Sequence, residues 1–255
     1  MKRLATSLVL IPAITWLILA GPQWALITVL AAIGLLAFRE YDQIAASHDI
    51  ARAGLPGMAA GLALMLAPAP GIIAVLAALA AMALALRVVD VASAMACAAS
   101  FTLGVLYIFG SLRCAIELRE MNHHWLMFAL LLSWAGDTAA LYIGRAFGRH
   151  KLAPRLSPAK SWEGAAGSVA AGVLAGGVYS YYLLPGVPLR WVLALAAAGN
   201  VAGQVGDLCE SALKRGAGVK DSGTLLRGHG GWLDRIDSSL FSVPVVYALL
   251  KLLPR

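Results

Sequence analysis

Long apolar runs separated by short polar turns recur along the whole chain, and they constrain its fold more than any other feature. Of the 255 residues, 60% are hydrophobic and only 13% are charged. Because a soluble domain of this size cannot bury so much apolar surface, the pattern predicts an integral membrane protein. At roughly 17 to 20 residues per span, the runs predict an all-α, polytopic transmembrane fold with about nine spans. They fall near 4–20, 24–38, 55–67, 71–86, 91–110, 125–143, 165–183, 190–209 and 238–253.

The number of spans and the role of the first run stay open. The third run is short for a span, and the Pro68–Gly71 break after it is compatible with a re-entrant pair, which would leave about eight spans. Residues 1–20 begin with Lys2 and Arg3 before an apolar run, as a signal peptide does. Because another apolar run follows almost at once, we favour a retained first span.

The basic residues of the chain lie mostly in short loops. Net charge is +7 and the pI is about 9.6, a balance that in a soluble protein would suggest a nucleic-acid partner. In a membrane protein it reports orientation, so we expect no nucleic acid. Under the nine-span pattern, one side of the membrane holds only five of the 20 Lys and Arg residues, namely Arg113, Arg119, Arg190, Lys251 and Arg255. The positive-inside rule then predicts a multi-pass protein of the inner (cytoplasmic) membrane, with the large basic loops in the cytoplasm.

The two halves of the chain differ in polarity. Residues 1–122 are nearly featureless, and their many small residues favour close packing of transmembrane helices. Residues 123–255 form the predicted catalytic region, because they carry two basic loops, 144–163 and 210–237. The first loop has no acid before Glu163, which suits either anionic lipid headgroups or a phosphate-binding surface.

Two acids stand inside or at the end of predicted spans. Asp137 lies within a span, where an ionisable group is costly, so we expect it to face an aqueous cavity or a partner side chain. Asp207 ends the eighth span, and if the helix continues, its neighbours at i+3, i+4 and i+7 share its face. They are Glu210, Ser211 and Lys214. Nearby glycines would let another helix approach closely: Gly199, Gly203 and Gly206.

Residues 207–237 interleave acids and bases around two clusters of glycines. Carboxylates beside lysines and arginines suit a site that holds hard cations together with polyphosphate. The glycines that flank His229 leave backbone N–H groups available to oxygen anions, so we interpret His229 as a ligand or phosphate contact rather than a packed histidine. The chain has no Walker or Rossmann pattern, which argues against the familiar soluble nucleotide-binding folds.

Two blocks of the C-terminal half carry a longer pattern. The first reads Ser211-x-Leu213-Lys214-Arg215-x4-Lys220-Asp221-x-Gly223-x2-Leu226-x2-His229-Gly230-Gly231-x2-Asp234-Arg235-Ile236-Asp237. The second reads Gly136-Asp137-Thr138, then Gly144-Arg145, Gly148 and Ser157-Pro158-x-Lys160-Ser161-x-Glu163-Gly164. Together they resemble the signature of the phosphatidate cytidylyltransferases, also called CDP-diacylglycerol synthases. The chain departs from that signature at Arg227, where Pro is usual, and at Trp232, where an aliphatic residue is usual.

The resemblance implies a polytopic homodimer that converts CTP and phosphatidic acid into CDP-diacylglycerol and pyrophosphate with Mg²⁺. It implies that the acids matching Asp207 and Asp234 hold Mg²⁺ beside a second, monovalent cation such as K⁺. By position, the same active-site signature includes Lys214, Lys220, Asp221 and Asp237.

The chemistry of this reaction suits the residue types present. The nucleophile would be a phosphate oxygen that is already anionic, so the lack of a Ser/His/Asp or Cys/His arrangement is no objection. The main requirement is to position two polyanions and to stabilise their charge. The expected CTP contacts are Lys214, Arg215, Lys220 and Arg235. The expected lipid-phosphate contacts are Lys160 and Arg145, and the division between these two sets stays open. The substrate-binding set is completed by Ser211 and His229, and by Asp137, Asp221 and Asp237 as further metal ligands or as residues that orient them.

Two other functions remain open at this stage. A CTP-dependent lipid kinase would release CDP and a phosphorylated lipid instead of pyrophosphate and a CDP-lipid. A secondary transporter could use Asp137 and Asp207 as ion sites. Most of the charge lies in loops rather than along spans, and no inverted repeat is visible, which disfavours the transporter.

Overall fold

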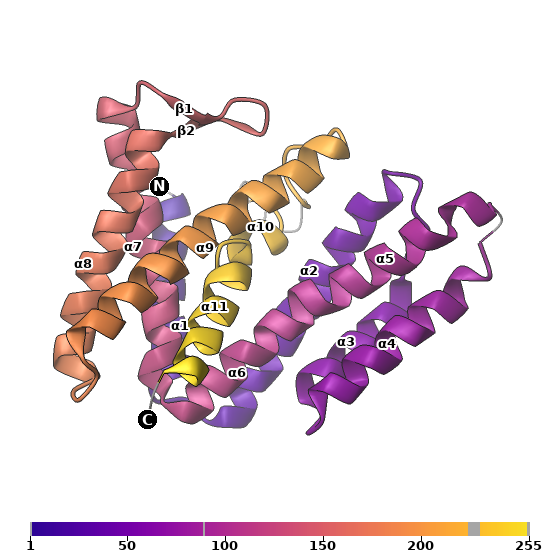
Figure 1. The fold of residues 1–255 in the computed structure, drawn as a ribbon, viewed down its shortest axis with the longest axis horizontal. Helices are drawn as coiled ribbons and strands as arrows, with labels where there is room; N and C mark the ends of the chain where they lie inside the picture. The colour runs from indigo at the N-terminus through magenta and orange to yellow at the C-terminus, as the bar shows by residue number, and fades with distance from the viewer. Residues whose placement is uncertain (1, 89, 224–229, 254–255) are drawn as a thin grey trace. The chain divides into compact units, whose positions relative to one another are not determined.

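The computed structural model describes residues 2–88, 90–223 and 230–253, and within them the chain is mainly helical (Figure 1). The predicted role of His229 and the departure at Arg227 therefore lie outside the described residues. The long helices are α1 (Lys2–Leu19), α2 (Gln23–Ala46), α3 (Gly54–Leu66), α4 (Pro70–Ala85), α7 (His123–Phe147), α8 (Trp162–Leu183), α9 (Leu189–Gly216) and α11 (Ser239–Leu252). The shorter ones are η1 (Val91–Ser93), α5 (Ala94–Gly104), the π-helical η2 (Val105–Gly110), α6 (Ser111–Met121) and α10 (Leu233–Ile236).

The predicted helical membrane protein is confirmed at this coarse level. Four helical segments of the described chain are long and apolar enough to cross a membrane: Gln23–Ala46, Val91–Met121, His123–Phe147 and Leu189–Gly216. Two shorter apolar helices, α3 and α4, follow the third and fourth predicted runs. The count of about nine spans stays a prediction.

Helix α2 continues to Ala46, eight residues beyond the predicted end of its span at residue 38. Charged residues begin at Arg39, directly after this predicted end. The structure instead buries Glu40 and Asp42, which are 2% and 6% exposed. Each carboxylate accepts backbone N–H groups from elsewhere in the chain, and such bonds offset the cost of burying a charge. Likewise α9 continues to Gly216, so the polar loop predicted from residue 210 begins later.

The first basic loop contains a strand pair that an all-α prediction does not include. Strands β1 (Lys151–Ala153) and β2 (Ser157–Ser161) form an antiparallel hairpin between α7 and α8 (Figure 1). The hairpin is tied to α8, because the Ser161 hydroxyl accepts the Gly164 N–H and caps that helix. Glu163 in the first turn of α8 accepts the backbone N–H of His150 just before β1. These contacts hold β2, and with it Lys160, against the start of α8.

The chain divides into two compact units that do not follow chain order, and the predicted division at residue 122 stays a prediction. The first unit contains residues 1–26, 114–212 and 236–255. In it α7 packs along α8 and also contacts α11. Helix α9 approaches α11 closely, because a Cβ at Gly206 would overlap the Asp237 carbonyl and the Phe241 ring. Gly199 and Gly203 face the same helix, as predicted for these glycines.

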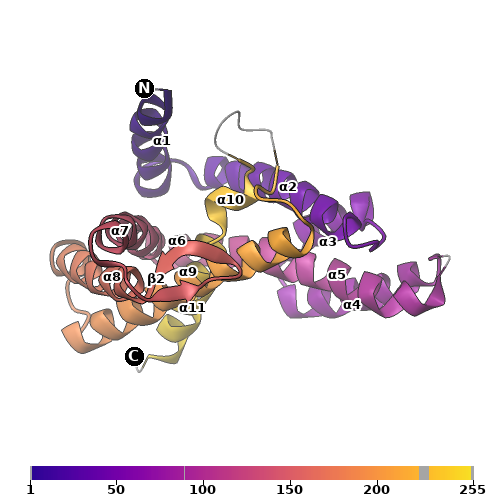
Figure 2. The same cartoon turned by 90° about the horizontal axis from the view of Figure 1, so that it is seen from above.

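The second unit contains residues 27–113 and 213–235. Helices α3, α4 and α5 lie side by side in it (Figure 2). Both ends of α3 are capped by charged side chains. Asp42 accepts the N–H groups of Ala53 and Gly54 at 2.7 and 3.1 Å, and Arg113 donates to the Ala67 carbonyl at 2.6 Å. These bonds satisfy backbone groups that a helix end leaves open.

Candidate active site

A cavity of about 250 Å³ in the first unit gathers three of the predicted site residues. Asp137 from α7, Lys160 from β2 and Asp207 from α9 line it, together with Gln204 one turn before Asp207. The Lys160 ammonium lies 2.5 Å from Asp207 Oδ2, and both side chains are partly exposed. The Ser211 hydroxyl donates to Asp207 Oδ1 at 3.4 Å. The hairpin that sequence reasoning missed is therefore what brings Lys160 to Asp207.

Asp137 lines the same cavity from within α7, where an ionisable group in a span is expected to face polar surroundings. Two other carboxylates, Asp207 and Asp237, act on it electrostatically, and Lys160 opposes them. Three acids and one lysine thus share one electrostatic environment, which favours the entry of further positive charge.

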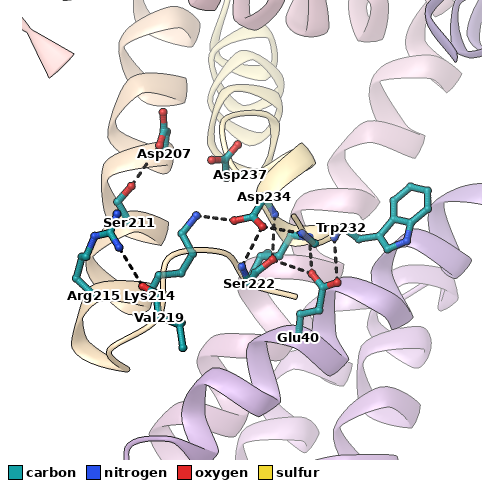
Figure 3. A network of polar contacts seen from close by, with 12 residues as sticks. Glu40, Asp207, Ser211, Lys214, Arg215, Val219, Ser222, Trp232, Asp234 and Asp237 are labelled. Atoms are coloured by element: carbon teal, nitrogen blue, oxygen red, sulfur yellow. Dashed lines mark hydrogen bonds and ion pairs between the residues drawn. The ribbon is translucent and has the colours of Figure 1, made fainter. Parts of the chain in front are cut away.

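Asp234 in the second unit sits in a dense set of hydrogen bonds (Figure 3). Lys214 Nζ lies 2.5 Å from Asp234 Oδ1, while the backbone N–H groups of Gly231 and Ser222 donate to Oδ2 at 2.7 and 2.9 Å. Burial alone would raise the pKa of Asp234, but these donors and the Lys214 charge hold that pKa below its usual value. The carboxylate is therefore ionised at neutral pH.

Glu40 is the residue at this site that sequence reasoning missed. Its Oε1 accepts the Trp232 N–H at 3.0 Å, and its Oε2 accepts the Leu233 N–H and the Ser222 hydroxyl, each at 2.9 Å (Figure 3). A charged residue directly after an apolar run was the available signal. This position in the sequence does not indicate which residues Glu40 contacts, because its partners lie more than 180 residues later in the chain.

Five other predicted site residues are exposed, namely Arg145, Arg215, Lys220, Asp221 and Arg235, and Asp237 is half-buried. Lys220 and Asp221 lie on the turn after α9, Arg145 in the last turn of α7, and Arg235 on α10. Arg215 in the last turn of α9 donates to the Val219 carbonyl at 3.1 Å. Asp237 accepts the Ser238 N–H at 2.7 Å. Their predicted roles in binding substrate stay predictions.

The two acids predicted to hold metal each face a cation already. Asp207 has the Lys160 ammonium at 2.5 Å, and Asp234 has the Lys214 ammonium at the same distance. Carboxylate oxygens are the ligands that Mg²⁺ prefers, so both positions fit a hard cation. In the part of the chain that the structure describes, no group of three or more His, Cys, Asp or Glu side chains is arranged to hold a metal by itself. Substrate phosphates commonly complete such sites.

The sequence matches the family described as "Cytidylyltransferase family" over residues 1–253. It is 38% identical to the phosphatidate cytidylyltransferase of Bacillus subtilis over 154 residues, which are 59% of this chain and 57% of that protein. It is also 38% identical to the phosphatidate cytidylyltransferase of Haemophilus influenzae over 153 residues, 57% of this chain and 53% of that protein. The matched region thus spans somewhat more than half the length of these curated relatives.

Proposed function

Because the chain belongs to the cytidylyltransferase family, we propose that it is a phosphatidate cytidylyltransferase. It transfers CMP from CTP to phosphatidic acid and gives CDP-diacylglycerol and pyrophosphate, a step of phospholipid biosynthesis. The family match over residues 1–253 carries the proposal. The two acid–lysine pairs, Lys160 with Asp207 and Lys214 with Asp234, support it, since they supply the charges that such a reaction needs.

The bond changes of the reaction explain which residues are needed. A phosphate oxygen of phosphatidic acid attacks the α-phosphorus of CTP, and the bond between that phosphorus and the bridging oxygen to the β-phosphate breaks. The nucleophile is already anionic, so no base has to remove a proton. The two substrates repel each other, and fixed cations offset that repulsion. Lys160 and Lys214, each held against a carboxylate, are pre-positioned for this task.

Asp207 and Asp234 supply ligands for Mg²⁺ in this proposal, with a monovalent cation such as K⁺ beside it. Bound Mg²⁺ would neutralise charge on the transferred and leaving phosphates. Lys220, Asp221, Arg215, Arg235 and Asp237 complete the CTP side of the site, and Arg145 assists Lys160 with the lipid phosphate. The apolar helices support a location in the inner membrane, and the basic loops support a site open to the cytoplasm. About nine spans and a homodimer as the working form complete the proposal and rest on the sequence pattern and the family resemblance.

The test uses purified protein in detergent with labelled CTP, phosphatidic acid and Mg²⁺, and compares wild type with Asp207→Asn and Asp234→Asn. We expect wild type to make CDP-diacylglycerol and pyrophosphate, and both variants to lose nearly all turnover. Asp207→Asn should keep wild-type stability, whereas Asp234→Asn should stay folded in detergent with a lowered unfolding midpoint, because its ion pair is buried. The matched control is Asp90→Asn, because Asp90 is exposed and its carboxylate accepts the Ala92 N–H near η1. Folded wild-type protein that leaves CTP untouched would contradict the proposal, and release of CDP with a phosphorylated lipid would identify a lipid kinase instead.

A further inference from the structure

A buried carboxylate in the N-terminal half holds both ends of the segment between α9 and α10. Glu40 is 2% exposed, and the three hydrogen bonds described for it come from Ser222 near one end of that segment and from Trp232 and Leu233 at the other. The described residues 217–223 and 230–232 are called the signature loop below, and Figure 3 shows Glu40 beneath Ser222 and Trp232 of this loop. The acid thus brings together two positions that stand ten residues apart.

The contacts of Glu40 require a carboxylate and not merely a polar side chain. Both of its oxygens accept hydrogen bonds, and all three partners are N–H or O–H donors. A glutamine could present an oxygen to one side only, so its NH₂ group would face the Trp232 N–H or the pair formed by Leu233 and Ser222. A buried donor left without an acceptor costs more than an ordinary hydrogen bond contributes.

Glu40 and Asp234 hold neighbouring donors of the same short segment. The Gly231 N–H goes to Asp234, while the next two N–H groups, of Trp232 and Leu233, go to Glu40. Ser222 joins the two acids directly, because its hydroxyl donates to Glu40 and its backbone N–H donates to Asp234. The orientation of Asp234 is therefore coupled to the position of Glu40.

Two glycines of the loop leave the space that Glu40 occupies. A Cβ at Gly223 would approach Glu40 Oε1, and a Cβ at Gly231 would overlap both Glu40 Oε2 and the Ser222 hydroxyl. The absence of side chains at these two positions is what lets the loop close over the carboxylate. The loop's glycines and the acid of α2 are thus complementary in shape as well as in hydrogen bonding.

We propose that Glu40 is a positioning residue for the reaction: it holds the signature loop so that Asp234 keeps the orientation in which it binds Mg²⁺ and pairs with Lys214. This inference rests on the proposed function for the role of Asp234. Glu40 does not touch substrate in this proposal, and it acts through Ser222, Trp232 and Leu233 alone.

Helix α2 offers a matched control two residues away. Asp42 is also a buried carboxylate, 6% exposed, and it also accepts two backbone N–H groups. Its donors are Ala53 and Gly54 at the start of α3, not residues of the signature loop. Glu40→Gln and Asp42→Asn therefore remove equivalent charges from one helix, and only the first disturbs the loop.

The experiment measures turnover, the Mg²⁺ concentration for half-maximal activity, and tryptic cleavage after Lys220 in the substrate-free protein. We expect Glu40→Gln to lower turnover about tenfold, since a buried donor left without an acceptor displaces the loop and with it Asp234. We also expect it to raise the Mg²⁺ requirement several-fold and to speed cleavage after Lys220. Asp42→Asn lowers the thermal midpoint but keeps the wild-type Mg²⁺ requirement and cleavage rate.

If Glu40→Gln needs no more Mg²⁺ than wild type for half-maximal activity, the inference is overturned. It is also overturned if Asp42→Asn raises the Mg²⁺ requirement equally, because that result would indicate a general loss of rigidity in α2. Proteolysis keeps the test separate from the proposed function. If wild type makes no CDP-diacylglycerol, faster cleavage in Glu40→Gln alone still supports the loop contact, whereas unchanged cleavage refutes it.

Discussion

The two acid–lysine pairs have the same ion-pair distance and opposite surroundings. Lys160 and Asp207 meet at 2.5 Å across an open cavity, with side chains 25% and 32% exposed. Lys214 and Asp234 meet at the same distance, with side chains only 10% and 8% exposed. Asp234 also accepts two backbone N–H groups, whereas the Ser211 hydroxyl is a long 3.4 Å from Asp207. The first pair is largely open to solvent, and the second is mostly covered by the protein around it.

Similar pairs of charged residues in a sequence therefore need not contribute similar energies to folding. An ion pair near water contributes little to stability, because solvent screens the charges and the side chains lose entropy when they are fixed. A buried pair is costly to break, because the remaining charge stays out of water. We therefore expect the first pair to matter mainly for activity, and the second to matter for both activity and folding.

The largest effect is expected from removing the lysine of the buried pair. Methionine is the replacement, because it is uncharged and similar in length to lysine, and the same change in the exposed pair is the comparison. Lys214→Met leaves the buried Asp234 carboxylate with backbone donors alone and should destabilise the protein by about 3–5 kcal/mol. Lys160→Met should cost about 0.2–1 kcal/mol. Unfolding midpoints in detergent, measured for the two variants side by side, test this contrast. Equal losses of stability would show that the burial of the second pair has no energetic consequence.

A smaller effect is expected from filling the space beside Glu40. Gly231→Ala places a Cβ against Glu40 Oε2 and the Ser222 hydroxyl, so the loop must shift. Overpacking of this kind costs about 1–3 kcal/mol, and turnover should fall with it. Gly71→Ala is the control, because no atom lies within 4 Å of a Cβ there and alanine favours a helix. Wild-type stability and turnover in Gly231→Ala would mean that the loop does not close over Glu40.

The sequence predicted the helical membrane class well, because apolar runs report directly on the bilayer. It left open whether the eighth span continues as a helix past Asp207, and the structure places Ser211 and Lys214 on α9 with Asp207. It did not predict the role of Glu40 or the hairpin that carries Lys160. In both cases the outcome depends on contacts between segments far apart in the chain, and periodicity carries no information about such partners. From the sequence alone, a charged residue such as Glu40 indicates the end of a span, because the hydrogen-bond donors that allow its burial are not known.

The smallest effect is expected from removing a single link between the two carboxylates. Ser222→Ala deletes the hydroxyl that donates to Glu40 but keeps the Ser222 backbone N–H that donates to Asp234. The loss should be about 0.5–1.5 kcal/mol in stability, with turnover reduced only a few-fold. Ser47→Ala is the control, since its hydroxyl donates to the Gln43 carbonyl on an exposed helix end. A loss as severe as that in Glu40→Gln would assign the coupling to the Ser222 hydroxyl and not to the backbone donors of Trp232 and Leu233. Denaturation in detergent, followed by turnover of the same samples, separates these two outcomes.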